Sequence, residues 1–579
     1  MITTDTGTRT SGRGLKPLRF LFGAIAVILS GCLGPAEPRL AARVVVTPGA
    51  VTLVAVQDTS RLIAVAADAK GNPINGKRFT WASSDYSVAT VDSIGLVIAV
   101  GNGTARITAT ADQTSDTATV VVDQKIVSIA VAQLNVTAWA GATFQLTATA
   151  RDANSYPAPS SKLNWTSSDS AIATVSPVGV VTARRAGSTT ISVVAQDRTA
   201  SARVDVQATL SGVLAISSTL TKSAGPYHVT GNILVPFGLL LRVEPGTTIL
   251  FDGPYYVRVD GMFVAIGLPT DSIRFTSAKS SPQAGDWSRI WFTNTSTSAS
   301  VNGAGGYVDG SAISYAVISY GGEIQFDASS PYFSNNHLHH VTGAPPRDWP
   351  NGAIWTCNST SVIRDNVIED NPVSGIYIGG GAVKISGNVI RRNTGAWGGG
   401  LFFANPNCAG SSFGTPIVEY NRISANRSSF GGGIALYSGA PIIRYNDITA
   451  NETTGTLSPG SNAQSGGAAL ATFTATAMQL SYNNIENNVS SATGATCALF
   501  FGDSFTGTMT ENNIGNPVTY EVYVNTTAKG SISLPTNYWN TTAATAVEAK
   551  IWDFTDDFSL AKVLYTPIRS ARQTSAGPP

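Results

Sequence analysis

The sequence Asn366-Val367-Ile368-Glu369-Asp370-Asn371 recurs 22 residues later as Asn388-Val389-Ile390-Arg391-Arg392-Asn393. A unit of this size combines a short apolar strand with Gly-rich and Asn corners, and it cannot bury an apolar face alone, so the units must stack. The pattern Asn-x-Ile-x-x-Asn starts at Asn366, Asn388, Asn421, Asn446 and Asn483, with degenerate copies from Asn336 and Asn512.

The repeated asparagine predicts a structural column along the stack. Its amide can satisfy backbone groups left open at a bend and can pair with the asparagine of the coil above and the coil below. The column is expected to contain Asn366, Asn388, Asn421, Asn446 and Asn483.

Short strands with one asparagine per coil resemble the right-handed parallel β-helix of the pectate-lyase-like superfamily, which includes many bacterial surface proteins. The resemblance covers residues 208–568 and implies about twelve coils, spaced about 4.8 Å apart. The segments Asn537-Tyr538-Trp539 and Ile551 to Phe558 are expected to cap the last open edge. Residues 569–579 are expected to be a disordered tail.

An earlier repeat appears when the chain is laid on itself with an offset of 84 residues. Trp81-Ala82-Ser83-Ser84-Asp85 then falls on Trp165-Thr166-Ser167-Ser168-Asp169. Alternating segments between turn residues predict antiparallel sandwiches at 43–123 and 124–207. These strings resemble bacterial immunoglobulin-like domains of group two, which implies spacer or adhesion modules. The fold class is therefore all-β, with two tandem immunoglobulin-like β-sandwiches followed by a right-handed parallel β-helix.

Four aspartates of the sandwiches have two interpretations. They can cap turns through their carboxylates, or they can bind calcium between modules, which makes calcium the one candidate cofactor. They are Asp68, Asp85, Asp152 and Asp169.

The N-terminus predicts a targeting segment, because basic residues precede a short apolar run from Phe20 to Leu29. The following Leu29-Ser30-Gly31-Cys32 resembles the lipobox of bacterial lipoproteins. The resemblance implies a signal peptide at 1–31, lipidation of Cys32, a linker at 32–42 and attachment to the membrane through lipid alone. Leu33 after the cysteine favours the outer membrane. The oligomeric state stays open.

Composition excludes a nucleic-acid partner. The 579 residues carry 37 basic and 36 acidic side chains, for a net charge of +1, and lack the basic excess that binds phosphate backbones. Cys357, Cys408 and Cys497 remain after Cys32, and an odd number leaves at least one thiol without an intramolecular partner. Whether Cys357 pairs with Cys408 stays open.

Aromatic residues recur at one position of successive coils. Counting back from the repeat asparagines places Trp355, Tyr377 and Phe402 in one outward column. Aromatic faces about 4.8 Å apart can stack sugar rings, or they can stabilise the sheet beneath a covering loop. The sequence leaves both interpretations open.

Three histidines lie together in His337-Leu338-His339-His340, and the repeat aligns His340 with Asp370 and Arg392. If the protein is an enzyme, these three residues are the catalytic candidates, acting as acid, base and carboxylate ligand on a polyuronic acid. The alternative is a solvated ladder of alternating charges. The paired-aspartate and histidine motifs of β-helix hydrolases and epimerases are missing, and no metal site is predicted.

The leading hypothesis is a lipid-anchored cell-surface protein in which Ig-like spacers present a β-helix for carbohydrate binding or adhesion, without catalysis. A surface polysaccharide lyase of the β-helix type is the first alternative. A purely structural stalk is the second. A glycan or cell-envelope partner is expected in the leading case.

Overall fold

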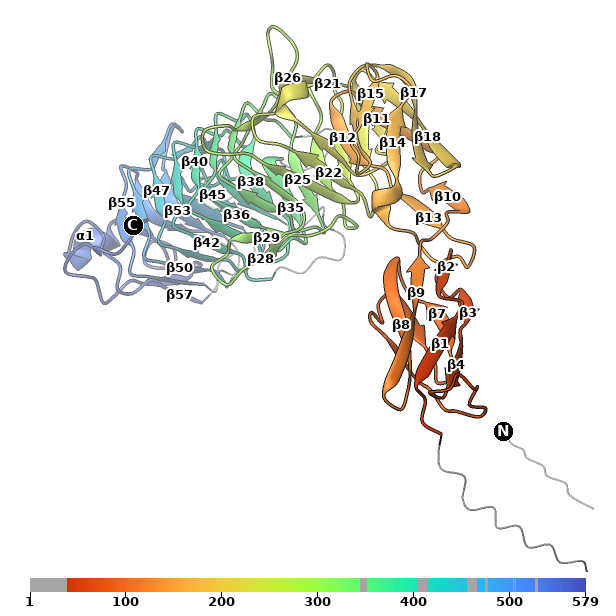
Figure 1. Ribbon diagram of the computed structural model, residues 1–579. Helices are drawn as coiled ribbons and strands as arrows, with labels where there is room; N and C mark the ends of the chain where they lie inside the picture. The colour runs from red at the N-terminus through yellow and green to blue at the C-terminus, as the bar shows by residue number, and fades with distance from the viewer. Residues whose placement is uncertain are drawn as a thin grey trace, which may run out of the picture. The chain divides into compact units, whose positions relative to one another are not determined.

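The computed structural model describes residues 39–343, 351–404, 408, 414–455, 466–473, 477–502, 505, 507–525 and 530–579 (Figure 1). Cys32 and the predicted signal peptide lie outside these ranges. The predicted all-β architecture is confirmed, since the one α-helix of the described residues is α1 (Ala544–Glu548) and the only other helical turns there are η1 (Ser160–Lys162) and η2 (Lys222–Ala224).

The first sandwich belongs to a compact unit that ends at Lys125. Its strands alternate buried and exposed residues, as β8 does, because successive side chains of a strand point to opposite faces. The two main sheets have the strand orders β2-β9-β8-β5 and β3-β7-β6. The strands are β1 (Arg43–Thr47), β2 (Ala50–Leu53), β3 (Thr59–Arg61), β4 (Ile63–Ala67), β5 (Thr80–Ser83), β6 (Ala89–Val91), β7 (Leu96–Ala99), β8 (Gly103–Ala111) and β9 (Thr114–Val122).

The second sandwich repeats this plan and opens the second compact unit, which runs from Ile126 to Pro579. Trp165 on β14 is buried in its core. The strands are β10 (Ser128–Val131), β11 (Asn135–Trp139), β12 (Ala142–Gln145), β13 (Ala148–Arg151), β14 (Asn164–Ser167), β15 (Ala173–Val175), β16 (Val180–Ala183), β17 (Gly187–Ala195) and β18 (Arg198–Gln207).

The β-helix stacks its strands in parallel along three faces, and Figure 1 shows the coils following one another from yellow-green to blue. The first face contains β20 (Ser218–Leu220), β22 (Leu240–Val243), β25 (Met262–Ile266), β30 (Ala312–Ser314), β33 (Tyr332–Ser334), β36 (Val362–Arg364), β39 (Lys384–Ser386), β42 (Ile417–Glu419), β46 (Ile442–Arg444), β50 (Gln479–Ser481), β54 (Thr508–Thr510), β57 (Ser531–Ser533) and β59 (Lys562–Leu564).

The second face carries the Asn-x-Ile-x-x-Asn strands. Its members are β19 (Leu210–Val213), β21 (Tyr227–Val235), β23 (Thr248–Phe251), β26 (Ile273–Ser277), β31 (Ala316–Ser319), β34 (His337–His339), β37 (Val367–Glu369), β40 (Val389–Arg391), β43 (Arg422–Ser424), β47 (Asp447–Thr449), β51 (Asn484–Glu486) and β55 (Asn513–Gly515).

The third face begins at the end of the long strand β21. It continues through β24 (Val257–Val259), β27 (Ile290–Phe292), β32 (Ile324–Asp327), β35 (Gly352–Cys357), β38 (Ser374–Ile378), β41 (Leu401–Phe403), β45 (Ile434–Leu436), β49 (Leu470–Thr472), β53 (Cys497–Phe501), β56 (Tyr520–Val524) and β58 (Ile551–Trp552). Short strands outside the faces are β28 (Ser300–Val301), β29 (Tyr307–Asp309), β44 (Arg427–Ser428), β48 (Glu452–Thr453) and β52 (Val489–Ser490).

The second sandwich is joined to the first coil by continuous β-sheet. Strand β12 pairs with β20, so Ala142 lies opposite Leu220 and Thr143 opposite Thr219. The Tyr227 hydroxyl also donates a hydrogen bond to the Gly141 carbonyl at 3.1 Å. The sequence predicted a domain boundary after residue 207, but the sheet crosses it and pairs the first open edge, which would otherwise expose unpaired backbone groups.

Asparagines form two ladders inside the corners. In the ladder between the first and second faces, the side chain of each asparagine donates to the Oδ1 of the next, from Asn366 through Asn388, Asn421, Asn446, Asn483 and Asn512 to Asn537. The ladder between the second and third faces runs from Asn371 to Asn516. It ends where Asn516 donates to the carboxylate of buried Glu521.

The C-terminal residues differ from the prediction of a disordered tail. Arg569 pairs with Glu511, and Arg572 pairs with Glu486. The Gln573 backbone N–H donates to Asn513 Oδ1 at 2.7 Å, and Asn513 Nδ2 donates to the Gln573 carbonyl at 2.9 Å. The tail therefore lies against outward polar residues of the last coils. Its sequence has no large apolar side chain, in keeping with these polar contacts.

We expect the double substitution Glu486→Gln and Glu511→Gln to release the tail, because both ion pairs lose their acidic partner. Trypsin should then cleave after Arg572 several-fold faster, while the melting temperature stays nearly constant, since exposed ion pairs contribute only about 0 to 1 kcal/mol. Glu452→Gln, which breaks the pair with Arg427 away from the tail, is the matched control. Equal cleavage rates in the wild type, the double variant and the Glu452→Gln control would contradict the docking of the C-terminal tail on the last coils.

The question of the cysteines is resolved by a disulfide between Cys357 and Cys408, whose Cα atoms are 5.6 Å apart. Cys497 is the free cysteine of the described residues, and it is buried. Burial raises the pKa of its thiol to about 12, so it is a thiol at neutral pH.

Candidate functional site

The aromatic column has the predicted register but not the predicted exposure. Trp355 lies beside Tyr377, and Tyr377 beside Phe402, on neighbouring strands of the third face. Trp355 is 4% exposed, however, and Tyr377 and Phe402 are 0% exposed. The prediction that these residues stack sugars at an open surface is therefore wrong, and the alternative of a covered stack describes them.

A second apolar layer covers the column. Trp397 contacts Phe402 edge to face with a centroid distance of 5.7 Å, and Phe430 is buried in the same cluster. The disulfide of Cys357 and Cys408 belongs to this cluster as well. Trp397 and Phe430 come from the segments that join the second-face and third-face strands of their coils. A column that points outward from the sheet is thus enclosed in a hydrophobic core of its own.

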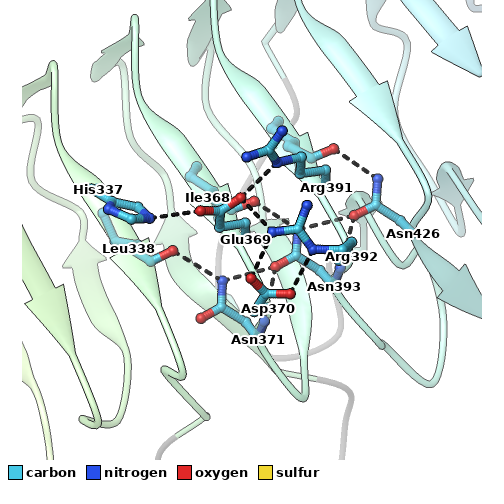
Figure 2. Close-up of polar contacts among 11 residues, drawn as sticks. His337, Leu338, Ile368, Glu369, Asp370, Asn371, Arg391, Arg392, Asn393 and Asn426 are labelled. Atoms are coloured by element: carbon cyan, nitrogen blue, oxygen red, sulfur yellow. Dashed lines mark hydrogen bonds and ion pairs between the residues drawn. The ribbon is translucent and has the colours of Figure 1, made fainter.

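The histidine, acid and arginine residues do form a column on the second face, as Figure 2 shows. His337 Nε2 lies 2.9 Å from Glu369 Oε1, and Arg391 Nε donates to Glu369 Oε2 at 2.6 Å. Arg392 makes two hydrogen bonds of 2.7 Å to the carboxylate of Asp370. The two carboxylates and the two arginines balance one another in charge across two neighbouring coils, and His337 adds a hydrogen bond from a third coil.

His340, Asp370 and Arg392 line one open groove of about 770 Å³, together with Tyr320 and Thr394. Residues 340, 370 and 392 all adopt positive φ at one corner, which brings them into register. The structure thus brings the three catalytic candidates together. Two of the three guanidinium nitrogens of Arg392, Nε and Nη2, are nevertheless bound to carboxylates, so the positive charge is already paired with Glu369 and Asp370.

Electrostatics favour the ladder of paired charges over acid–base chemistry. The hydrogen bond from Arg392 lowers the pKa of Asp370, and the same bond raises the pKa of Arg392. Burial alone would raise the pKa of Glu369, but hydrogen bonds from Arg391 and His337 bring it below its usual value. Burial and the neighbouring His337 lower the pKa of His339 to about 4. A general base at neutral pH needs a pKa nearer 7.

We expect Arg392→Gln to raise the pKa of Asp370 toward the ordinary value of about 3.9, as measured by carboxyl NMR titration. Because the folded-state pKa of Asp370 is depressed, its contribution to stability is present above the unfolded-state pKa and is lost as the pH falls through the folded one. Acid unfolding of the wild type should therefore respond to Asp370 only below about pH 4. An Asp370 pKa above 5 in the wild type would contradict the pairing and favour catalysis.

A tyrosine stack was missed by the sequence analysis. Tyr420, Tyr445 and Tyr482 occupy the corner before the first asparagine ladder, with ring centroids 5.2 and 5.1 Å apart and interplanar angles of 9° and 18°. Tyr420 at one end is 40% exposed. Each tyrosine directly precedes a repeat asparagine, so the recurring Tyr-Asn dipeptide was the available signal.

The four aspartates of the sandwiches cap turns. Asp68 Oδ1 accepts hydrogen bonds from the backbone N–H groups of Lys70 and Asn72 at 2.9 Å. Asp85, Asp152 and Asp169 accept the N–H of the residue two positions later. Within the described ranges no three His, Cys, Asp or Glu side chains are grouped to hold a metal ion.

No helix among the described residues is long and apolar enough to cross a membrane.

Comparison with solved structures shows limited similarity. The S-layer protein rSbsC(31-844) is 23% identical over 29% of this chain and 28% of its own, with a TM-score of 0.16. The Yersinia pseudotuberculosis adhesin InvE is 19% identical over 28% of this chain and 58% of its own, with a TM-score of 0.22. The Escherichia coli adhesin FdeC is 19% identical over 30% of this chain and 66% of its own, with a TM-score of 0.19. The chain thus spans less than two thirds of each of these three structures.

Comparison with protein families is more informative. No curated protein shows significant similarity to the chain. Residues 42–122 and 125–206 match the bacterial Ig-like domain (group 2), and residues 287–409 match the right handed beta helix region. The chain therefore contains two bacterial Ig-like domains followed by a right-handed β-helix region.

Proposed function

We propose that the protein is a lipid-anchored surface protein of the bacterial outer membrane, in which Ig-like domains hold the β-helix away from the membrane to bind a carbohydrate or another cell-envelope partner. The observation that carries the proposal is the sheet pairing of β12 with β20, which fixes the second Ig-like domain to the first coil. A β-helix joined in this way is held by backbone pairing to the Ig-like domain that precedes it.

A role in binding rather than catalysis is supported by the charged column. Glu369 and Asp370 are held by arginines, and their pKa values lie below the ordinary range. In this arrangement neither carboxylate is poised to exchange protons at neutral pH. Product release from a polyuronate that disappears in His340→Ala would overturn this part of the proposal in favour of a lyase.

Anchoring is tested by Cys32→Ala. The wild-type protein should fractionate with membranes and carry an acyl mass on its N-terminal residue, whereas the variant should lose both, because the thiol that accepts the lipid is gone. Mass spectrometry of the N-terminal peptide measures the modification directly. A variant that stays in the membrane fraction, with no acyl mass on the wild type, would refute the lipid anchor.

Binding is tested with the mature protein on a glycan array and on isolated envelope fractions. Saturable binding to at least one glycan or fraction is expected. Complete absence of binding on both would leave the β-helix as a stalk.

A further inference from the structure

A groove of about 510 Å³ runs along the corner between the first and second faces. Its lining includes Tyr420, Gly387, Arg422, Lys384 and Arg364, and we call it the tyrosine groove. Its volume lies within the range of about 300 to 1,000 Å³ that is common for small-ligand sites. None of the catalytic candidates lines it, so it is separate from the charged column.

Gly387 opens one face of the tyrosine stack. In the corner column, positions 365, 387, 420 and 445 all have φ between 56° and 68°, so they occupy equivalent places in successive coils. Tyr445 covers one face of the Tyr420 ring, with 5.2 Å between centroids. In the coil on the other side stands Gly387, which has no ring to cover the second face of Tyr420, and both residues line the groove. The Asp365 carboxylate reaches toward this place, with Oδ1 2.4 Å from the position of a Cβ on Gly387, and Tyr420 is 40% exposed.

The basic side chains of the groove differ in whether they form ion pairs. Arg364 pairs with Asp365 at 2.7 Å, and Lys384 pairs with Glu419 at 3.0 Å. Arg422 on β43 makes no ion pair with any described residue, and it is exposed and lines the same groove as Tyr420. An unpaired guanidinium in the same groove as an exposed aromatic ring favours a ligand that combines an anionic group with an apolar face.

The groove is bounded at both ends. Ala304 and Gly305, in the turn between β28 and β29, lie at one end. Pro578 and Pro579 of the docked C-terminal tail lie at the other.

We propose that the tyrosine groove binds a saccharide that carries a carboxylate or phosphate, with the C–H face of one sugar ring on Tyr420 and the anionic group on Arg422. The inference rests on the proposed function, and it names the site and the ligand class. Planar guanidinium groups bind both anions through paired hydrogen bonds, which fixes the orientation of the ring. Ser386 on the groove wall offers a hydroxyl to the sugar.

Calorimetry with three tetramers of one backbone tests the ligand class. The probes are cellotetraose, its C6-oxidised glucuronate form and its 6-phosphate form. The mature protein should bind at least one anionic tetramer at least about tenfold more tightly than the neutral one, which corresponds to about 1.4 kcal/mol. Comparison of the glucuronate tetramer with the 6-phosphate tetramer shows whether the site prefers a carboxylate or a phosphate. Equal affinity for all three probes, or no binding of either anionic probe, would overturn the inference.

Variants test the site. Arg422→Gln should lower affinity for the anionic tetramer about tenfold, because the charged partner is lost while the aromatic face remains. Gly387→Tyr should abolish binding by extending the stack into the groove. The backbone accepts tyrosine at this corner, and the close contact of a new Cβ is the Asp365 carboxylate end at 2.4 Å. Tyr420→Ala, which removes the ring, gives the same test if Gly387→Tyr does not fold.

Arg427→Gln is the matched control, because Arg427 is an exposed arginine of the next corner that pairs with Glu452 and does not line the groove. It should bind as the wild type does. Folded Gly387→Tyr or Tyr420→Ala protein that still binds the anionic tetramer would overturn the inference. In that case, glycan binding by the wild type would leave the proposed function intact, whereas absence of glycan and envelope binding by the wild type would refute the proposed function itself.

Discussion

Replacing Asn421 by alanine is expected to lower the free energy of unfolding of the β-helix by about 3 kcal/mol or more. Asn421 is fully buried. Its Oδ1 accepts from the backbone N–H and the side chain of Asn388, and its Nδ2 donates to the carbonyls of Ile385 and Glu419 and to Asn446 Oδ1. Alanine leaves several of these groups buried without partners, at about 1 to 3 kcal/mol each before relaxation. Denaturant and thermal midpoints measure the loss.

The matched control for this prediction is Asn487→Ala. Asn487 is an exposed corner asparagine with φ 58°, and the equivalent corners hold Ala425 and Ala450 at φ 54° and 56°. Alanine therefore fits this backbone, and the midpoint should hardly change. If Asn421→Ala were as stable as Asn487→Ala, the asparagine ladder would contribute nothing measurable to the stability of the β-helix.

The double substitution Trp355→Ala and Tyr377→Ala is expected to produce the second large effect. Removing either ring alone should cost about 3 to 5 kcal/mol, as large-to-small changes in cores do. The two rings stack on each other with a centroid distance of 5.7 Å, so the pair should cost less than the sum. The Tyr377 hydroxyl also donates to the Ala404 carbonyl at 3.0 Å. Thermal unfolding measures the stability, and glycan binding should persist wherever the protein is folded.

Two controls separate this effect from binding. Tyr377→Phe keeps the ring and loses one hydrogen bond, so it should cost about 1 kcal/mol. Tyr420→Ala removes an exposed tyrosine and should keep stability within about 1 kcal/mol while losing anionic saccharides. A double variant that melts like the wild type but fails to bind glycans would restore the interpretation that Trp355 and Tyr377 form an exposed surface for stacking sugar rings.

The repeat was sufficient to predict the coils and their register. Because every coil must place its asparagine in the same corner, counting from Asn366 to Asn388 fixed which residues are neighbours on all three faces. The pairing of Trp355 with Tyr377 followed from the same count. Register is a local property of a periodic chain, and it is therefore readable from spacing.

Exposure was not predictable in the same way. Trp397 and Phe430 lie in segments between the repeat strands, and nothing in the spacing says that these segments fold back over the third face. The docking of the tail on Glu486 and Glu511 is a similar long-range contact between a polar segment and distant coils. The role of Gly387 could not be predicted from the repeat alone. It became clear only after the structure showed that Tyr420, Tyr445 and Tyr482 form a column in which Gly387 takes the place of a tyrosine.

The pairing of β12 with β20 has a consequence for mechanical load. If the β-helix grips a partner while the N-terminus is held at the membrane, tension enters the rod through the second Ig-like domain. Two parallel routes then carry the force, the covalent connection into β19 and the backbone ladder of β12 and β20, reinforced by the hydroxyl of Tyr227 on Gly141. The ladder pairs two residues of each strand, whereas each later coil is paired along three faces, so the ladder is the weaker connection under such a load. Opening of the ladder would let the chain lengthen under load while the stacked coils keep their shape.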